Sequence, residues 1–353
     1  MQGDFFSAKD HIVIYGAGST GRRVLDFLKR RGWKADFFID REANGPLNGI
    51  PVKKPDDPQL DFNAIVIVAL FNHQDNIPAV INSLKQSGFK KIIPYTELFV
   101  HFNKEFPVHY WLGPLEIYQA DKDKIKQALA LFEDKNSRKL FSAFLDFRLS
   151  GNPFCMPDAD KENIYFPSDI PMQRPDRFVD CGAFTGDTLF SAKKIFGILE
   201  SCRAFEPDPD NFKKLNEANE ASPFARDAVF YPYAVWSAKK QLSFDKSGSL
   251  SGSIKESGSQ KVDAVTLDEC LNGYNPSLIK MDTEGSELEA LQGARRMISS
   301  GKPGLAVSVY HKPEHLWEIP LLIKEICPDY SFYLRSHGEN GYDTVLYARN
   351  PKA

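Results

Sequence analysis

The first hundred residues alternate short apolar runs with helical patterns. The apolar runs are HIVIYG, ADFFID, AIVIVAL and KKIIPY, and amphipathic stretches at 21–31 and 76–87 stand between them. Strand-length runs that alternate with helical periodicity are typical of βαβ units, whose strands form a parallel sheet. We therefore expect a small Rossmann-type α/β domain at residues 1–99.

Residues 100–175 follow a different pattern. The segment 100–120 is irregular and rich in aromatic side chains, whereas 121–150 carries two helical stretches and is closed by Gly151. Glycine is common just after a helix. We interpret the segment as a helical connector, and its aromatic side chains are natural parts of a lid over a small-molecule site: Trp111, Tyr165 and Phe166.

A second α/β series runs from 176 to 353. Its apolar runs are RFVDCG, RAFEP, VFYPYAV, LIKMD, GLAVSVY, YSFYLRS and DTVLYAR, with helical patterns between most of them and a helix expected at 286–298. The polar segment 247–260 interrupts the series as a loop between hairpin strands. The expected fold class is thus α/β, with two Rossmann-like doubly wound domains joined by the connector.

Composition and charge narrow the partners. The chain has 353 residues, of which 42% are hydrophobic and 26% charged, as in a soluble globular protein with two domains. Its formal net charge is −3, so no global positive field favours a nucleic acid or an anionic membrane. We therefore expect a small molecule or glycan as partner, and the sequence leaves a homo-oligomer open.

The N-terminal residues and the cysteines indicate a reducing compartment. The start of the chain lacks the basic and apolar regions of a signal peptide, and the longest apolar run, 64–71, is too short to span a bilayer. The five cysteines include no CxxC pair that would indicate zinc or redox chemistry. We expect a cytoplasmic protein with reduced thiols.

The sharpest motif is FVDCGAFTGDT at 178–188, an apolar strand that ends in DxGxxxG and leads into a helix. Glycines let the backbone approach a ligand closely, and free N–H groups at a helix start can receive a carboxylate. The alternative is a tight turn with an incidental acid. The residues that we expect to bind a cofactor here are Asp180, Gly182, Ala183, Gly186, Asp187 and Thr188.

Two later strand ends extend this site. Glu206 lies 26 residues after Asp180, where a carboxylate can accept hydrogen bonds from both ribose hydroxyls, and Asp208 follows it. The third strand end has no acid, and Ala234 and Val235 are further candidate cofactor contacts there, through their backbone.

Charged residues also end the strand LIKMD. Lys280, Asp282 and Glu284 follow an apolar run, and ligands bind beyond the carboxyl ends of the strands in an open α/β sheet. If this strand neighbours the strand of Asp180, both acids face one pocket. The alternative is that Asp282 and Glu284 merely cap the next helix.

His311 ends the next strand, and a near-neutral pKa would suit it to remove a proton from an acceptor hydroxyl. A metal site with His315 is disfavoured because Pro313 breaks the helical spacing between them. Simple packing beside Tyr310 remains the alternative. We therefore assign no metal.

These pieces together resemble the FkbM family of methyltransferases. The matching stretches are VDCGAFTGDT, FEPD, TLDE, KMDTEGSELEALQGA, SVYHKPEHLWEIP and YLRSHGENGYDTVLYA, which lie in order between about 175 and 350. The resemblance implies a class I fold with a seven-stranded sheet, S-adenosylmethionine as cofactor, and O-methylation of a sugar or natural-product hydroxyl. Ser336 stands where a second histidine is expected, which puts a role for His337 in doubt.

The resemblance also assigns roles. Asp180, Gly182 and Gly186 match the cofactor turn, Glu206 the ribose acid, and Asp282 with Glu284 the acidic strand end. Methyl transfer is an in-line displacement that needs alignment and, for an alcohol, removal of its proton. We expect Asp282 or His311 to accept that proton, with Lys280 supporting the acceptor or the acids.

The N-terminal domain carries its own glycine-rich turn. GxGxxG at 16–21 follows a strand and opens a helix, and an acid ends the next strand, 19 residues after the last glycine. The domain loosely resembles those in front of sugar acyltransferases. A nucleotide or nucleotide-sugar site, an NAD site and a packing module all remain open. The residues concerned are Gly16, Gly18, Ser19, Gly21 and Asp40, with Asn72 and His73 after the AIVIVAL strand.

Two other functions compete with methyl transfer. An NAD-dependent oxidoreductase or epimerase would use the turn at 16–21, but no Tyr-x-x-x-Lys pair follows it. A non-catalytic nucleotide sensor with two binding domains is the third hypothesis, because fold alone does not determine function. Bound S-adenosylmethionine with turnover separates methyl transfer from both.

Overall fold

The computed structural model describes residues 5–7, 9–161, 164–245, 253–254 and 260–351. It divides the chain into two compact units. The first comprises Met1–Ile117, Ser142–Ala159 and Gly338–Tyr342, and the second comprises Tyr118–Phe141, Asp160–His337 and Asp343–Ala353. This division differs from the expected sequence 1–99, 100–175 and 176–353, because the segment expected as a connector divides between the units.

The first unit is built on a five-stranded parallel sheet in the order β3-β2-β1-β4-β5. Its strands are β1 (Ile12–Tyr15), β2 (Phe37–Ile39), β3 (Val52–Lys53), β4 (Ile65–Val68) and β5 (Lys91–Pro94). Every residue of β4 is buried, as in a central strand of a parallel sheet that is covered on both faces. The predicted Rossmann-type βαβ series is confirmed.

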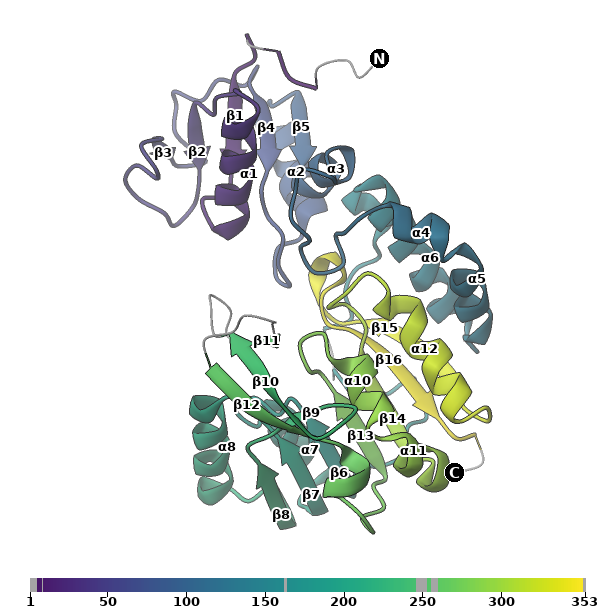
Figure 1. Cartoon of the computed structure of the whole chain (residues 1–353). Coiled ribbons are helices and arrows are strands. Elements are labelled where there is room, and N and C mark those ends of the chain that lie inside the picture. Colours follow the sequence, from purple (N-terminus) through teal and green to yellow (C-terminus); the bar gives the residue numbers. More distant parts are fainter. Residues whose placement is uncertain (1–4, 8, 162–163, 246–252, 255–259, 352–353) are drawn as a thin grey trace. The chain divides into compact units, whose positions relative to one another are not determined.

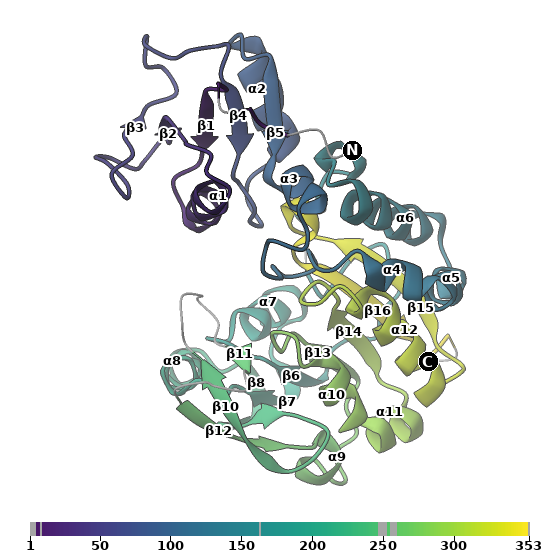
Figure 2. The same cartoon turned by 45° about the horizontal axis from the view of Figure 1, so that its top comes forward.

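Helices cover both faces of this sheet. Figures 1 and 2 show α1 (Ser19–Arg30) on one face and α2 (Ile77–Gln86) on the other. Further elements of this unit are α3 (Tyr95–His101), η1 (Pro153–Cys155) and η2 (Glu339–Gly341). The helix α6 (Lys135–Ser150) contains a boundary between the two units.

The second unit contains the seven-stranded sheet that the resemblance implies, in the order β15-β16-β14-β13-β6-β7-β8. The strands are β6 (Arg177–Cys181), β7 (Leu199–Phe205), β8 (Ala225–Tyr231), β13 (Leu278–Met281), β14 (Gly304–Ser308), β15 (Ser331–Ser336) and β16 (Thr344–Arg349). β6 pairs in parallel with β13 and β7, whereas β16 is antiparallel to β14. The carboxyl ends of β6, β7 and β13 therefore meet at one edge.

Helices flank this sheet too. They are α7 (Asp187–Phe196), α8 (Pro209–Ala221), α9 (Leu267–Cys270), α10 (Glu287–Gln292), α11 (Arg295–Gly301) and α12 (His315–Ile326), with α4 (Glu116–Ala120) and α5 (Lys122–Leu131) earlier in the chain (Figure 1). The prediction of a single helix at 286–298 is wrong. The helical segment breaks at Gly293, where a Cβ atom would lie 2.0 Å from the carbonyl oxygen of Trp236.

A second, four-stranded sheet stands beside the large one, and the sequence pattern predicted only its hairpin. Its order is β11-β10-β12-β9, with β9 (Ala234–Val235), β10 (Lys240–Asp245), β11 (Ser253–Ile254) and β12 (Gln260–Val265). β10 and β12 pair antiparallel, as expected for a hairpin. Most of the loop predicted at 247–260 lies outside the described residues.

Among the described residues, no helix combines the length and apolar character that crossing a membrane requires.

Candidate cofactor site and its acidic cluster

A cavity opens in the second unit at the edge where β6, β7 and β13 end. It brings together nine of the predicted site residues: Gly182, Asp187, Thr188, Glu206, Ala234, Val235, Lys280, Asp282 and Glu284. The sequence argument did not select the other lining residues as ligand contacts: Tyr165, Phe184, Phe205, Pro207, Asn211, Tyr233, Thr283 and Ser286. Tyr165 was expected only as part of a lid. Five further predicted residues are not among those that line the cavity: Asp180, Ala183, Gly186, Asp208 and His311.

The turn after β6 needs both of its glycines. Gly182 has φ +79°, and a Cβ atom there would lie 1.8 Å from the carbonyl oxygen of Asp282. Gly186 has φ +91° and serves as the N-cap of α7 without a capping side chain. The N–H groups in the first turn of α7 therefore receive no hydrogen bond from a capping side chain. Asp187 and Thr188, which belong to this turn, line the cavity. Buried Ala183 donates its N–H to the Phe205 carbonyl at 3.0 Å, which fastens the turn to β7.

Three non-glycine residues of the cavity wall have left-handed backbone conformations. Tyr165, Phe184 and Glu284 have φ values of +71°, +48° and +53°. Such conformations cost free energy and persist only where the surrounding structure holds them, which occurs often at functional sites. Their presence in one wall supports a ligand-binding role for this cavity.

Glu206 lies at the end of β7 with a buried, pre-oriented carboxylate. Its Oε2 accepts a hydrogen bond from the Phe184 N–H and its Oε1 from the Asp208 N–H, both at 2.8 Å. Burial raises the pKa of Glu206 to about 7, although these two backbone N–H groups oppose the shift. Each oxygen keeps a lone pair, so the carboxylate can still accept hydrogen bonds from ligand hydroxyls.

Asp208 does not belong to the cavity wall, which differs from its predicted role in cofactor binding. Its carboxylate accepts hydrogen bonds from the N–H groups of Asp210 and Asn211, at 2.8 and 3.0 Å, and so caps α8. An aspartate at the first position before a helix commonly does this. The cap places Asn211 of α8 in the cavity wall.

Lys280 and Asp180 form a buried ion pair beneath the cofactor turn. Lys280 Nζ lies 2.9 Å from Asp180 Oδ1 and donates a hydrogen bond to the Gly182 carbonyl at 2.6 Å. Burial lowers the pKa of Lys280, but Asp180 and then Asp282 raise it above its ordinary value. Burial raises the pKa of Asp180 to about 6, with Lys280 opposing. Lys280 therefore fixes the turn to β13, and Asp180 supports it from behind.

Asp282 is the acid that faces the cavity. The Tyr165 hydroxyl donates a hydrogen bond to its Oδ2 at 2.7 Å, and His311 Nε2 lies 3.4 Å from its Oδ1. Glu284 Oε2 lies 3.6 Å from the same ring nitrogen. The simple capping alternative for Asp282 and Glu284 is therefore insufficient, because both carboxylates share the His311 ring as a partner.

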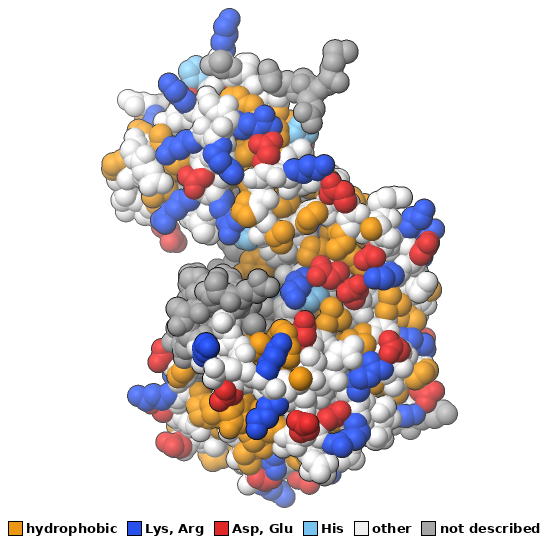
Figure 3. All heavy atoms as spheres, in the orientation of Figure 1, with side chains coloured by type: hydrophobic (Ala, Val, Ile, Leu, Met, Phe, Trp, Pro, Cys, Tyr) orange, Lys and Arg blue, Asp and Glu red, His pale blue; other side chains and the backbone are white. Residues whose placement is uncertain are grey.

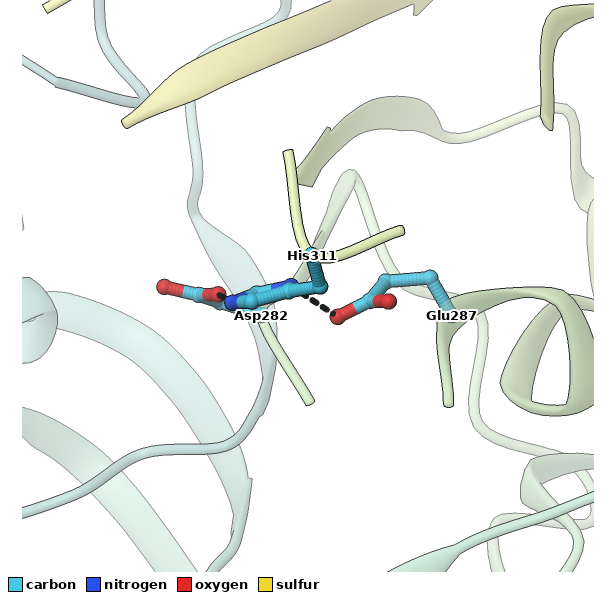
Figure 4. A group of neighbouring side chains, drawn as sticks. All are labelled: Asp282, Glu287 and His311. Carbon is cyan, nitrogen blue, oxygen red and sulfur yellow. Dashed lines mark ion pairs between the residues drawn. The ribbon is translucent and has the colours of Figure 1, made fainter. Parts of the chain in front are cut away.

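His311 lies between two carboxylates. Figure 4 shows its ring with Asp282 on one side and Glu287 on the other. The Nδ1 atom is 2.9 Å from Glu287 Oε1, and His315 Nδ1 is 3.1 Å from Glu287 Oε2. His311 also packs beside Tyr310, with ring centroids 4.2 Å apart, as the packing alternative expected.

The protonation of His311 differs from the near-neutral pKa that the sequence suggested. Burial lowers the pKa of His311, but the carboxylates of Glu287, Glu284 and Asp282 overcome this and raise it to about 10. The ring is therefore an imidazolium at neutral pH, and an imidazolium has no lone pair with which to accept a proton. A cation in this position instead orients Asp282, whose Oδ1 lies 3.4 Å from the His311 Nε2 atom.

Glu287 was missed by the sequence argument, although it lies within the KMDTEGSELEALQGA stretch. It is fully buried and starts α10, and its Oε1 accepts hydrogen bonds from the N–H groups of Thr283 and Gly285 at 2.8 and 3.3 Å. Burial raises the pKa of Glu287, but His311 and His315 dominate and hold it well below its ordinary value. The spacing to His311 carried no signal of this contact, because it depends on β13 and β14 being neighbours.

Asp282, Glu287 and His311 are also the residues at which a metal ion has to be considered, although the sequence predicted none. Ligand atoms of Asp282, Glu287 and His311 lie within 4.8 Å of one another. However, Glu287 approaches Nδ1 and Asp282 approaches Nε2, so the ring separates the two carboxylates. One ion can contact only one of the two ring nitrogens, so an ion there would replace one of the two ion pairs of His311.

His337 has a structural environment in the second unit. Its Nδ1 lies 2.8 Å from the Asp160 carbonyl oxygen, and its Nε2 lies 2.8 Å from the Tyr347 hydroxyl. The side chain is buried. These contacts account for the histidine without a part in chemistry, in line with the doubt that Ser336 raised.

The N-terminal unit contains a second cavity, at the ends of β1, β2 and β4. The predicted residues Gly16, Gly18, Ser19, Asp40 and Asn72 line it. Gly21 instead lets α1 approach the turn, because a Cβ atom there would lie 2.0 Å from the Gly16 carbonyl oxygen. His73 does not line this cavity, and its carbonyl accepts a hydrogen bond from the Glu339 N–H at 3.0 Å.

Charged side chains of both signs lie on the face of the protein that Figure 3 shows. On the face that Figure 3 shows, acidic and basic side chains are interspersed rather than gathered into fields of one sign. Nucleic-acid binding normally requires a basic stripe or patch.

Comparison with known proteins gives a family match within the second unit, which contains the candidate cofactor cavity. Residues 180–342 match the methyltransferase FkbM domain. Over 103 residues the chain is 32% identical to the hexuronic acid methyltransferase AglP of Haloferax volcanii, a match that covers 28% of this chain and 42% of that relative. The chain thus matches less than half of the relative's length.

A solved structure extends the likeness beyond that domain. The methyltransferase FkbM structure from Methylobacillus flagellatus KT superimposes with a TM-score of 0.79 at 24% identity and covers 96% of this chain and 89% of its own. This likeness shows a common fold. The family match therefore assigns residues 180–342 to the methyltransferase FkbM domain, and the common fold and the seven-stranded sheet agree with it.

Proposed function

We propose that this protein transfers the methyl group of S-adenosylmethionine to a hydroxyl of a sugar, glycan or natural-product-like acceptor. The observation that carries the proposal is that one cavity contains two acids, Glu206 at the end of β7 and Asp282, which is held by Tyr165 and His311. Glu206 is available to bind the cofactor, and Asp282 is available to accept the proton of the acceptor hydroxyl.

The cofactor has a complementary group at each part of the cavity. Its methionine carboxylate fits the start of α7 at Asp187 and Thr188, where uncapped N–H groups favour an anion. Its ribose hydroxyls fit the free lone pairs of Glu206. Its adenine fits the wall formed by Tyr233, Ala234 and Val235.

Asp282 is the proposed general base. As the acceptor oxygen attacks the sulfonium methyl group, a C–O bond forms and the C–S bond breaks, and the hydroxyl proton passes to Asp282. Alignment of the two reactants supplies the larger part of the rate enhancement, and general base catalysis adds roughly 100- to 10,000-fold. His311 and Tyr165 position Asp282 without touching the reacting atoms.

The acceptor class rests on two supports. The family resemblance implies hydroxyl acceptors of sugars and natural products, and the relative from Haloferax volcanii is described as a hexuronic acid methyltransferase. A hydroxyl acceptor also agrees with a carboxylate base in the cavity. We therefore place sugar hydroxyls first among the acceptors.

The experiment pairs binding with turnover. The purified full chain is titrated with S-adenosylhomocysteine and then incubated with methyl-labelled S-adenosylmethionine and separate neutral sugars, hexuronic acids and macrolide alcohols. Label transfer to a sugar hydroxyl that is lost in Asp282→Asn supports the proposal. Cofactor binding with transfer only to non-carbohydrate acceptors overturns the sugar assignment, and no adenosyl-ligand binding beside tight NAD binding overturns methyl transfer altogether.

A further inference from the structure

The cavity of the N-terminal unit lies at a point of the sheet that favours ligand binding. β1 stands between β2 and β4, so the first crossover leads to one side of β1 and the later strand returns on the other side. In open α/β sheets, ligands bind in the crevice beyond the carboxyl ends of the strands at such a switch point. The turn after β1 and the segment after β4 both line the cavity, through Gly16, Gly18, Ala69 and Asn72.

The start of α1 presents a site for an anion to this cavity. Gly18 is the N-cap and provides no capping side chain, and the first turn of the helix contains no acidic residue. Gly18, Ser19 and Thr20 all line the cavity. Uncapped N–H groups and the helix dipole together favour a phosphate at such a helix start.

Thr20 is an independent sign of a ligand. The residue lines the cavity although it is only 6% exposed. Within the described part of the chain, no hydrogen-bond partner is found for its hydroxyl. A hydroxyl that is not engaged within the protein can donate its proton to a ligand oxygen in the cavity.

Asp40 lines the same cavity and can bind a ligand group next to the anion site. Its Oδ2 accepts a hydrogen bond from the Ala17 N–H at 2.7 Å, and its Oδ1 accepts bonds from the N–H groups of Glu42 and Ala43 at 2.8 Å. Burial raises the pKa of Asp40, but these three N–H groups and Lys54 hold it below its ordinary value. The carboxylate is therefore ionised, fixed in place and able to accept a bond from a ribose hydroxyl through Oδ2.

We propose that the N-terminal unit binds the ribose and phosphate groups of a nucleotide, with the phosphate at Gly18, Ser19 and Thr20 and the ribose hydroxyls at Asp40. A nucleotide-sugar and a dinucleotide share this chemistry. The ionised Asp40 repels a phosphate on the ribose 2′-oxygen, so NADP is excluded by the same contact that favours an unmodified ribose. This proposal does not depend on the methyl-transfer reaction of the other unit.

Calorimetric titration of the full chain with UDP, UDP-N-acetylglucosamine, NAD and NADP in separate runs tests the proposal. We expect saturable binding of the uridine nucleotides, of NAD, or of both, and the pattern distinguishes the two sources. NADP should bind more weakly than NAD by about tenfold or more, which corresponds to 1.4 kcal/mol. No binding of any of the four overturns the proposal.

Variants at Gly18 locate the binding. A Cβ atom at Gly18 meets nothing within 4 Å, so Gly18→Ala and Gly18→Asp both fit the fold, and aspartate is a favourable N-cap. We expect Gly18→Ala to retain binding within a few fold, whereas Gly18→Asp should weaken it about tenfold or more, because its carboxylate occupies the anion site. Thermal unfolding checks that both variants are folded. Equal nucleotide affinity in the two variants overturns the proposed site.

Discussion

Lys280 and Asp180 lie 2.9 Å apart in the core of the methyltransferase unit, with side-chain exposures of 3% and 0%. The pair joins β13 to β6 directly below the cofactor turn, and Lys280 also holds the Gly182 carbonyl. Because charges buried this deeply are costly unless they are paired, the pair makes the shape of the turn depend on the pairing of two central strands.

Removing one partner should therefore be severe. Lys280→Met leaves the Asp180 carboxylate buried and uncompensated, and we expect it to lower the free energy of unfolding by about 3–5 kcal/mol. Urea denaturation measures this. The double variant with Asp180→Asn should recover part of the loss, while Lys213→Met, which removes an exposed pair with Glu217, should change little. A mild effect of Lys280→Met alone would contradict a structural role for the pair.

Asp282 and His311 should separate in kinetics. Asp282→Asn should lower kcat by about 100-fold or more if Asp282 is the base, and the affinity for S-adenosylhomocysteine should stay within a few fold. His311→Gln should have a smaller effect on kcat, since His311 orients the base and does not accept the proton. Single-turnover methyl transfer measures both. Full activity in Asp282→Asn with none in His311→Gln would reverse the assignment.

The ion pairs of His311 predict a pH dependence of stability. Its pKa in the folded protein is raised to about 10 from an ordinary 6.5. A raised pKa stabilises the fold fully below about pH 6.5, and the stabilisation is lost as the pH rises toward 10. Unfolding of the wild type and His311→Gln between pH 6 and pH 10 should therefore show a difference that shrinks with rising pH. A constant difference would mean that His311 is not charged.

Cofactor affinity should depend on the ionisation of Glu206. Burial raises the pKa of Glu206 to about 7, and only the carboxylate offers all its lone pairs to ribose hydroxyls. At pH 6 about a tenth of the protein is ionised at this group, so S-adenosylhomocysteine should bind roughly tenfold more weakly than at pH 8. In Glu206→Gln we expect weaker binding and a flat profile; an unchanged slope there would assign the titration to another group.

The close approach at Gly182 can be separated from its backbone conformation. Gly182→Ala adds a Cβ atom 1.8 Å from the Asp282 carbonyl oxygen at φ +79°, whereas Gly273→Ala has φ +83° with nothing within 4 Å. The control should lose about 1 kcal/mol from the positive φ alone. Gly182→Ala should lose several times more and should also lose S-adenosylhomocysteine binding, as denaturation and calorimetry would show. Equal losses would exclude a role for the contact.

The local pattern of apolar and polar residues predicted many of the residues that line the candidate cofactor cavity. The DxGxxxG turn, the acid at Glu206 and the strand end at Asp282 could be found because each lies at the junction of an apolar run with a polar loop. The seven-stranded sheet followed from the family resemblance, whereas the sequence left open whether the strands of Asp180 and Asp282 are neighbours. All three positions lie in or directly below the cavity wall.

Contacts between distant segments could not be predicted in the same way. Tyr165 reaches Asp282 across 117 positions of sequence, and nothing in the local pattern of either segment encodes that distance. The break between α10 and α11 lies at Gly293, where the close approach of Trp236 again involves another part of the chain. The division of the connector between two units has the same origin.

The sequence by itself determined the periodic elements, the glycine-rich turns and the acids that end the strands, because these depend on residues that are neighbours along the chain. Only the tertiary structure decided which partners those acids contact. Glu287, His311 and Asp282 become one ion-paired series once β13 and β14 lie side by side. The carboxylates that the fold places around His311 then turn a histidine with an ordinary near-neutral pKa into a stable cation, because they outweigh the lowering of its pKa by burial.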